Sequence, residues 1–408
     1  MKKYLFTYLL PALLLGLSSV SFVACGDDDE EESFVEDAVV KVDSKGNAKG
    51  DHTFVQIDDN NFYIDGFKYT VVNSGELEVS GYDGYAKLVG KKSIIKGLEF
   101  GERHFVVTSI GQNALMYCDI SGLFIPSTVT RIGKGAFSNC TALTTINIPE
   151  GITVISDETF KSCPKLTSIK IPNKVTSIGN GAFYYCPLLT SITIPDNVTS
   201  IGEYAFCDCV CLNSINIPSG VTSISEYTFK GCLSLTSITI PEGVTSIGYG
   251  AFLDCEALTS ITIPDNVTTI ESSVFGSCTG LVSVTISKNV SVIHSSTFYE
   301  CSSLASITIP NNVTTIEYGA FSPCRNLTSI TIGSSVTSIW EGAFSRCPNL
   351  KDVYCLAKMA PDARYSFISN SDDDPNLSAA ILHVPAESIK SYKDHYPWSD
   401  FGTIVAIE

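Results

Sequence analysis

A pattern of apolar and polar positions repeats every 23 residues through most of the chain. Phenylalanine recurs at this interval from Phe137 to Phe344, and a cysteine follows each of these phenylalanines three residues later, from Cys140 to Cys347. The stretch Leu189–Leu212, LTSITIPDNVTSIGEYAFCDCVCL, shows the whole unit. Fixed periods of about 20 to 50 residues are typical of stacked repeat architectures. The sequence therefore predicts one elongated repeat array over residues 110–350.

Each unit predicts two short strands and two turns. The segment L-x-x-I-x-I alternates apolar and polar residues and is rich in Ile and Thr, which favours a strand with one buried face. A proline such as Pro195 or Pro241 follows in most units and ends the strand, because it lacks a backbone N–H. A second extended piece, V-T-S-I, and a tight turn at A-F-x-x-C complete the unit. One unit cannot bury its own apolar side chains, so we expect about 10 to 11 units to stack as a mostly β solenoid.

The flanks of the array lack the period. Residues 51–109 contain Asp65-Gly66 between apolar runs, a hairpin signal, and are predicted to form an N-terminal β cap. Residues 351–408 are predicted to form a mixed C-terminal cap. In this cap we expect Leu382–Val384 to be the last strand and the segment after Pro385 to start a short helix.

The first 24 residues are predicted to be an export signal. Residues 1–24 combine Lys2 and Lys3 with a long apolar stretch and a small residue before Cys25, which is typical of a secretory signal peptide. The segment resembles a bacterial lipoprotein signal, in which cleavage precedes a cysteine that becomes lipidated, here Cys25. Phe22 departs from the Leu usual in such signals. The resemblance implies membrane attachment through a lipid anchor only.

Residues 25–50 are predicted to be a lipidated acidic linker. Its run Asp27–Glu32 resembles the acidic export signal of surface lipoproteins from certain Gram-negative anaerobes, and a plain solvated spacer is the alternative. We therefore expect an outer-membrane, lipid-anchored protein exposed at the cell surface, with the inner face of the outer membrane as the other possibility.

Charge and composition exclude several functional classes. The net charge of −17 argues against nucleic-acid binding, which needs clustered Lys and Arg. The five histidines have no metal-ligand spacing, and no nucleophile constellation or glycine-rich phosphate loop is present. We therefore expect no enzymatic activity, no catalytic residue, no metal and no cofactor.

Fifteen cysteines suggest disulfides in an exported protein. The ten of the repeat should stack in parallel with Cβ atoms about 4.8 Å apart, however, too far for a usual bridge, so we predict buried free thiols. Cys207 and Cys211 flank Cys209 at variable, mostly polar positions, which indicates exposed thiols or a local bridge rather than a metal site.

The repeat resembles the BspA-like type of leucine-rich repeat, also called the Treponema pallidum type. The residues that carry the resemblance are Leu235-Thr-Ser-Ile-Thr-Ile-Pro241, Val244-Thr-Ser-Ile247, Ala251-Phe252 and Cys255, in about ten copies. The resemblance implies a curved solenoid with a strand sheet on its concave face. It also implies a cell-surface binding role, because some members are adhesins for host matrix proteins or act in contact between cells.

Two surfaces are candidates for recognition. Residues between the inward Leu and Ile of each first strand, such as Ser237 and Thr239, should form an exposed face of hydroxyl groups, suited to hydrogen bonding or simply a soluble filler. The variable stretch around the repeated Phe collects aromatic residues, which interfaces favour. We predict this edge as the ligand-binding site, with its rings packed over neighbouring units as the alternative; its residues are Tyr184, Tyr185, Tyr204, Tyr227, Tyr249, Tyr299, Tyr318 and Trp340.

The leading hypothesis is a non-enzymatic surface scaffold that binds a host extracellular protein, a glycan or a neighbouring cell. The alternatives are a structural component of the envelope and an accessory protein for polysaccharide capture.

Overall fold

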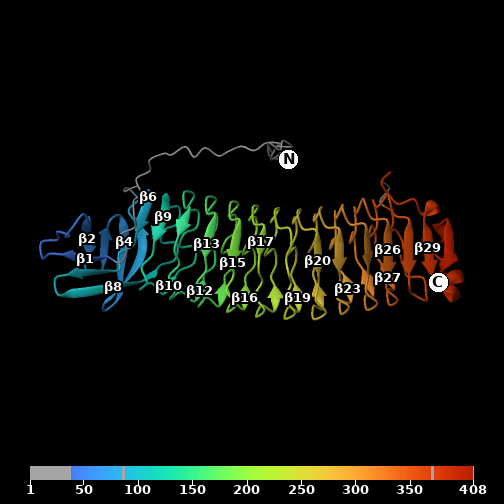
Figure 1. The fold of residues 1–408 in the computed structure, drawn as a ribbon, viewed down its shortest axis with the longest axis horizontal. Helices are drawn as coiled ribbons and strands as arrows, with labels where there is room; N and C mark the ends of the chain where they lie inside the picture. Colours follow the sequence, from blue (N-terminus) through green and yellow to red (C-terminus); the bar gives the residue numbers. More distant parts are fainter. Residues whose placement is uncertain (1–37, 85–87, 369–371, 408) are drawn as a thin grey trace, which may run out of the picture. The chain divides into compact units, whose positions relative to one another are not determined.

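The computed structural model describes residues 38–84, 88–368 and 372–407. The predicted signal peptide, Cys25 and the acidic run lie outside the described residues. The described part of the chain is a mostly β solenoid of about 13 turns of about 23 residues. Figure 1 shows the turns side by side, with the colour advancing along one axis from the N-terminal to the C-terminal end.

The first strands of neighbouring turns pair in parallel over most of the array, with interruptions that divide the row into four sheets. Ile192 of one turn lies opposite Ile169 and Ile215 of its neighbours, so the register equals the repeat length. These strands are β11 (Thr145–Ile146), β13 (Ser168–Lys170), β15 (Ser191–Thr193), β17 (Ser214–Ile215), β20 (Ser260–Thr262), β22 (Ser283–Thr285), β24 (Ser306–Thr308), β26 (Ser329–Ile332) and β28 (Asp352–Cys355).

The second strand of each turn forms a second parallel row (Figure 1). Its members are β10 (Arg131–Ile132), β12 (Val154–Ile155), β14 (Ser177–Ile178), β16 (Ser200–Ile201), β18 (Ser223–Ile224), β19 (Ser246–Ile247), β21 (Thr269–Ile270), β23 (Val292–Ile293), β25 (Thr315–Ile316) and β27 (Ser338–Ile339). Both rows confirm the strands predicted from the sequence.

The core is a set of columns that run along the solenoid. The rings from Phe137 to Phe344 are buried and stacked, with neighbouring centroids 5.2 to 5.8 Å apart and nearly parallel planes. Each cysteine of the repeat donates its thiol to a backbone carbonyl of the preceding turn, as Cys232 does to Phe206 at 3.3 Å. The described cysteines are all free, which confirms the predicted thiol column.

The cap at the N-terminal end is a single sheet that joins the array. Its strands are β1 (Val39–Val42), β2 (Phe54–Asp58), β3 (Asn61–Ile64), β4 (Phe67–Asn73), β5 (Glu76–Tyr82), β7 (Gly97–Phe100) and β8 (Arg103–Ile110), while β6 (Gly90–Ser93) and β9 (Ile120–Phe124) start the row of first strands. Asp65 and Gly66, both with positive φ, form the predicted hairpin turn between β3 and β4.

The boundary that we placed at residue 51 is wrong at one point. Strand β1 pairs with β7 inside the cap sheet, although residues 39–42 fall in the segment predicted as linker. Val40 and Val42 are buried there and alternate with exposed residues, so one face of this edge strand lies against the core.

The array continues beyond Leu350, where the sequence period was predicted to end. Phe367, 23 residues after Phe344, extends the stack with a centroid distance of 5.4 Å. Strands β29 (Ile381–Val384) and β30 (Thr403–Ala406) extend the parallel sheet, so the predicted last strand is followed by another. Short helices lie between and before these strands: η1 (Leu377–Ala379), η2 (Ala386–Ser388), α1 (Ile389–Lys393) and η3 (Trp398–Asp400).

The aromatic residues of this cap cover the last ring of the stack. Trp398 and Phe401 are buried and meet the ring of Phe367 edge-on at 5.8 Å.

Candidate functional site

The turns around the repeated Phe residues share one backbone conformation in most laps. Two residues with positive φ lie four positions apart, the first two residues before the Phe and the second two residues after it. Gly181 (φ 56°) and Tyr185 (φ 57°) are one such pair, and Tyr204 (φ 56°) and Asp208 (φ 58°) are the next. This conformation costs free energy in residues with a Cβ, whereas glycine adopts it readily. The turns therefore present side chains from a backbone that would favour glycine.

Four tyrosines of these turns form a continuous row that we call the tyrosine ladder: Tyr184, Tyr204, Tyr227 and Tyr249. Tyr204 and Tyr227 stack at 4.9 Å, and Tyr227 meets Tyr249 edge-on at 5.1 Å. Tyr184 meets Tyr204 edge-on at 6.5 Å, with an angle of 81° between the ring planes. Tyr185 adjoins the ladder at 6.5 Å from Tyr184 and is 49% exposed. Five of the eight predicted site residues are thus brought together.

Local packing explains the shape of the ladder. Tyr227 (φ 52°) leans over Gly250 of the next turn, where an added Cβ would lie 2.8 Å from the tyrosine ring. Burial and the hydrogen bond with Tyr249 together raise the pKa of Tyr227 to about 12. Burial also raises the pKa of Tyr184. These phenols therefore stay protonated and can donate hydrogen bonds at neutral pH.

A hollow of about 290 Å³, the ladder hollow, lies beside Tyr184 and Tyr204. Charged side chains dominate the rest of its lining, which consists of Glu158, Lys161, Asn180, Gly181, Glu203, Cys207, Asp208 and Lys230. The ammonium of Lys161 lies 5.8 Å from the centre of the Tyr184 ring, and that of Lys230 lies 5.5 Å from Tyr227. Ammonium groups at this distance attract the ring faces and hold the tyrosines in place.

The prediction of an exposed Cys207 is wrong. The side chain is 2% exposed at the floor of the ladder hollow, and burial raises its pKa to about 12. Cys207 occupies the same turn position as Tyr184 and Lys230, whose longer side chains are partly exposed. Cys211 is partly exposed, and both cysteines are free.

The remaining predicted residues lie elsewhere on the array. Tyr299 and Tyr318 line a second hollow of about 450 Å³, together with Tyr365 and Arg346. Trp340 is 47% exposed and contacts no other aromatic ring among the described residues. The structure therefore divides the predicted edge into two tyrosine groups and one separate tryptophan.

Several residues of these hollows were not predicted. Tyr365 follows Gly342 by 23 residues, so extending the period past Leu350 would have found it. Lys161 and Lys230 share one turn position with Tyr184, but nothing in the sequence shows that their side chains fold over tyrosine rings.

The hydroxyl face has the predicted alternation. In β15, β20 and β24 the central Ile is buried while Ser and Thr on either side are exposed. Ser329 and Thr331, nearer the C-terminal cap, are only partly exposed.

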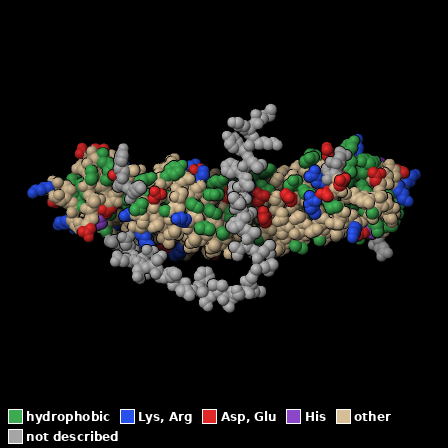
Figure 2. Space-filling model, turned by 90° about the horizontal axis from the view of Figure 1, so that it is seen from above, with side chains coloured by type: hydrophobic (Ala, Val, Ile, Leu, Met, Phe, Trp, Pro, Cys, Tyr) green, Lys and Arg blue, Asp and Glu red, His purple; other side chains and the backbone are tan. Residues whose placement is uncertain are grey.

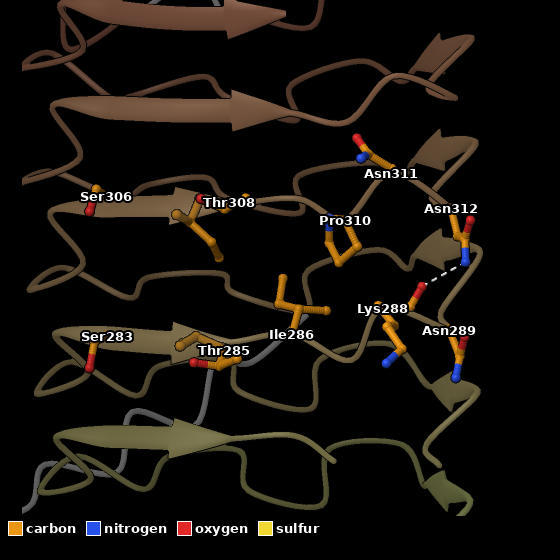
Figure 3. A pocket seen from close by; sticks show the side chains of 12 residues that line it. Ser283, Thr285, Ile286, Lys288, Asn289, Ser306, Thr308, Pro310, Asn311 and Asn312 are labelled. Atoms are coloured by element: carbon orange, nitrogen blue, oxygen red, sulfur yellow. Dashed lines mark hydrogen bonds between the residues drawn. The ribbon is translucent and has the colours of Figure 1, made fainter. Parts of the chain in front are cut away.

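Two hollows on the hydroxyl face coincide with interruptions of the parallel pairing. One, of about 720 Å³, spans β22 and β24, which lie in different sheets. Figure 3 shows Ser283 and Thr285 beside Ser306 and Thr308, with Asn312 donating a hydrogen bond of 2.8 Å to the carbonyl of Lys288 at the rim. The other, of about 420 Å³, includes Ser237 and Thr239, where no strand is assigned. Neither hollow is lined by an aromatic side chain or a carboxylate.

The described ranges contain neither a metal-binding cluster nor a membrane-spanning helix. Within them, no group of three or more His, Cys, Asp or Glu side chains is arranged to hold a metal ion. No helix in these ranges has the length and apolarity needed to cross a bilayer. On the face drawn in Figure 2, basic and acidic side chains are interspersed rather than separated by sign.

Comparison with known proteins identifies the family of the repeat. The family model for the BspA type leucine-rich repeat region matches residues 108–236 and 222–351, in six copies. A leucine-rich repeat protein from Bacteroides ovatus is 29% identical over 76% of this chain and 98% of its own, with a TM-score of 0.48. The Treponema pallidum leucine-rich repeat protein is 27% identical over 47% of this chain and 88% of its own, with a TM-score of 0.42.

A third solved structure supports the fold. The pneumococcal vaccine antigen PcpA is 17% identical over 87% of this chain and 99% of its own, with a TM-score of 0.51, so the two share the solenoid fold. No curated protein matches the chain. Since the family model covers more than half of the sequence, this chain belongs to the BspA-type leucine-rich repeat family.

Proposed function

We propose that this protein is a lipid-anchored surface scaffold that binds an extracellular macromolecule through the edge that carries the tyrosine ladder. The array is a repeat scaffold of the leucine-rich type, which is consistent with binding. The observation that carries the proposal is the contiguity of Tyr184, Tyr204, Tyr227 and Tyr249, whose rings touch in succession across adjacent turns.

The backbone supports a role beyond packing. Tyr204 and Tyr227 occupy left-handed positions, whereas the equivalent residues in flanking turns are Gly181 and Gly250. A bulky residue in this conformation costs about 1 to 2 kcal/mol relative to glycine. Tyr204 is 40% exposed, so burial of its ring recovers only part of this cost.

Attachment to the outer membrane through Cys25 is part of the same proposal. Lipidation would hold the array at the membrane while leaving the solenoid free to present its edge. The partner is a host extracellular protein, a glycan or the surface of a neighbouring cell.

The test uses cells that display the full protein. Attachment to immobilised matrix proteins, mucin and partner cells is measured for the natural chain and for a Tyr204→Gly, Tyr227→Gly double variant. We expect attachment to at least one surface and a loss of tenfold or more in the variant. Equal attachment by both proteins, or none by either, would favour a structural role in the envelope.

A further inference from the structure

The ladder hollow has the composition of a carbohydrate site rather than of a protein interface. Five of its ten lining residues are charged: Glu158, Lys161, Glu203, Asp208 and Lys230. The buried centre of a protein–protein interface is instead depleted in charged residues. Its volume of about 290 Å³ lies just below the range for small-ligand pockets, about 300 to 1,000 Å³. A hollow of this size can hold a single small polar ring.

The charges in the hollow are mixed, which argues against a highly charged ligand. Three carboxylates face two ammonium groups. Glu158 and Lys161 already pair at 3.6 Å, whereas Glu203, Asp208 and Lys230 form no ion pair with a described residue. A polyanion would meet the carboxylates without enough compensating cations, and a polycation would meet Lys161 and Lys230. An uncharged ligand that both donates and accepts hydrogen bonds avoids both penalties.

The aromatic walls supply the second half of such a site. The planes of Tyr184 and Tyr204 stand at 81° to each other, so the hollow has two differently oriented aromatic surfaces. A pyranose ring has faces of C–H groups that pack on the negative face of an aromatic ring, and a rim of hydroxyls in its own plane. Carboxylates and ammonium groups beside the tyrosines would accept from and donate to those hydroxyls.

We propose that the ladder hollow binds one sugar unit of an uncharged glycan, with Tyr184 and Tyr204 as walls and Glu203, Asp208 and Lys230 as hydrogen-bonding partners. This assignment rests on the proposed function and names its ligand class. Tyr227 and Tyr249 lie along the same row and would contact neighbouring units of the chain.

The test measures binding of the purified full-length protein to neutral polysaccharides, namely starch, xylan, mannan and laminarin, with heparin and poly-L-lysine as charged comparisons. We expect saturable binding to at least one neutral polysaccharide and at least a tenfold loss in Tyr204→Gly. Glycine suits the φ of 56° at this position, so the backbone of the turn is retained. Lys230→Met, which keeps most of the length of the side chain but not its charge, should weaken binding several-fold.

Tyr117→Gly is the matched control. Tyr117 has a φ of 63° and is 64% exposed on an equivalent turn, but it lies outside the ladder. Its variant should bind as the natural chain does. Preferential binding of heparin or poly-L-lysine, absence of binding to all four neutral polysaccharides, or equal losses in Tyr117→Gly and Tyr204→Gly would each overturn the assignment.

The outcome is separable from that of the proposed function. Attachment to protein-coated surfaces that depends on Tyr204 but is not inhibited by any neutral polysaccharide would retain the scaffold function and refute the glycan assignment. If no surface is bound in a Tyr204-dependent way and no neutral polysaccharide binds, the scaffold function and the glycan assignment are both refuted.

Discussion

Replacing Tyr227 tests whether the tyrosine ladder is maintained at a conformational cost. The ring of Tyr227 contacts Tyr204 and Tyr249, and each aromatic pair stabilises the fold by about 0.5 to 1.5 kcal/mol beyond area burial. Its φ of 52° costs about 1 to 2 kcal/mol in any residue with a Cβ. Tyr227→Gly removes both terms, so we expect the free energy of unfolding to change by less than about 2 kcal/mol.

Tyr227→Ala separates the two terms. Alanine loses the ring contacts but keeps the backbone cost, so this variant should be about 1 kcal/mol less stable than Tyr227→Gly. The free energies come from urea unfolding followed by circular dichroism, using the midpoint and slope of each curve. An alanine variant as stable as the glycine variant would refute the assigned backbone conformation.

Gly250 provides an independent check on the same contact. A Cβ at Gly250 would lie 2.8 Å from the ring of Tyr227, so Gly250→Ala should cost more in the natural chain than in the Tyr227→Gly background. We expect a coupling energy of at least about 0.5 kcal/mol in the double-mutant cycle. Additive effects would mean that the ring does not lie over Gly250.

Three further predictions concern the core and the anchor. Phe229→Ala removes a buried ring stacked between two others and should lower the free energy of unfolding by about 3 to 5 kcal/mol in urea titrations, whereas a loss below about 1 kcal/mol would contradict the column. Burial raises the pKa of column thiols such as Cys186 and Cys278 to about 12, whereas the same thiols have a pKa near 9 in the unfolded chain. Their contribution to stability should be fully present below pH 9. Above pH 9 the free energy of unfolding should fall by about 1.4 kcal/mol per pH unit for each thiol. Circular dichroism from pH 7 to pH 11 checks this, and unchanged stability at pH 10.5 would refute it. Cys25→Ala should abolish both palmitate labelling and recovery in the membrane fraction, and retention of both would exclude this cysteine as the lipid anchor.

The repeat core was predictable because each of its positions has one packing solution. Phe, Cys and Ile return every 23 residues, and the structure stacks them in columns with the same interval. The continuation to Phe367 was missed because the Leu, Ile and Pro pattern ends near Leu350, although the Phe spacing does not. Side chains from the C-terminal cap replace the lost strand residues around this last ring.

The site was predictable in its residue types but not in its grouping. Tyr184 and Tyr299 occupy the same position of the repeat, yet Tyr184 meets Tyr204 and Tyr299 lines the other hollow. The difference depends on the side chains of the next turn, and the position of a residue within its own repeat does not show which side chains those are. The same reasoning failed for Cys207, which is buried although the equivalent position is mostly polar in other turns.

The different constraints on the strands and on the Phe turn explain why the Phe turn can vary in sequence. Strand positions are constrained by stacking on both sides, so a substitution there disturbs two neighbouring turns. The left-handed positions bear no buried side chain, and glycine fills them without strain at Gly181, Gly250 and Gly319. A tyrosine at such a position costs local stability but leaves the columns intact, as at Tyr204 and Tyr227. An array of this kind can therefore acquire or change a binding edge one turn at a time while its core sequence stays fixed.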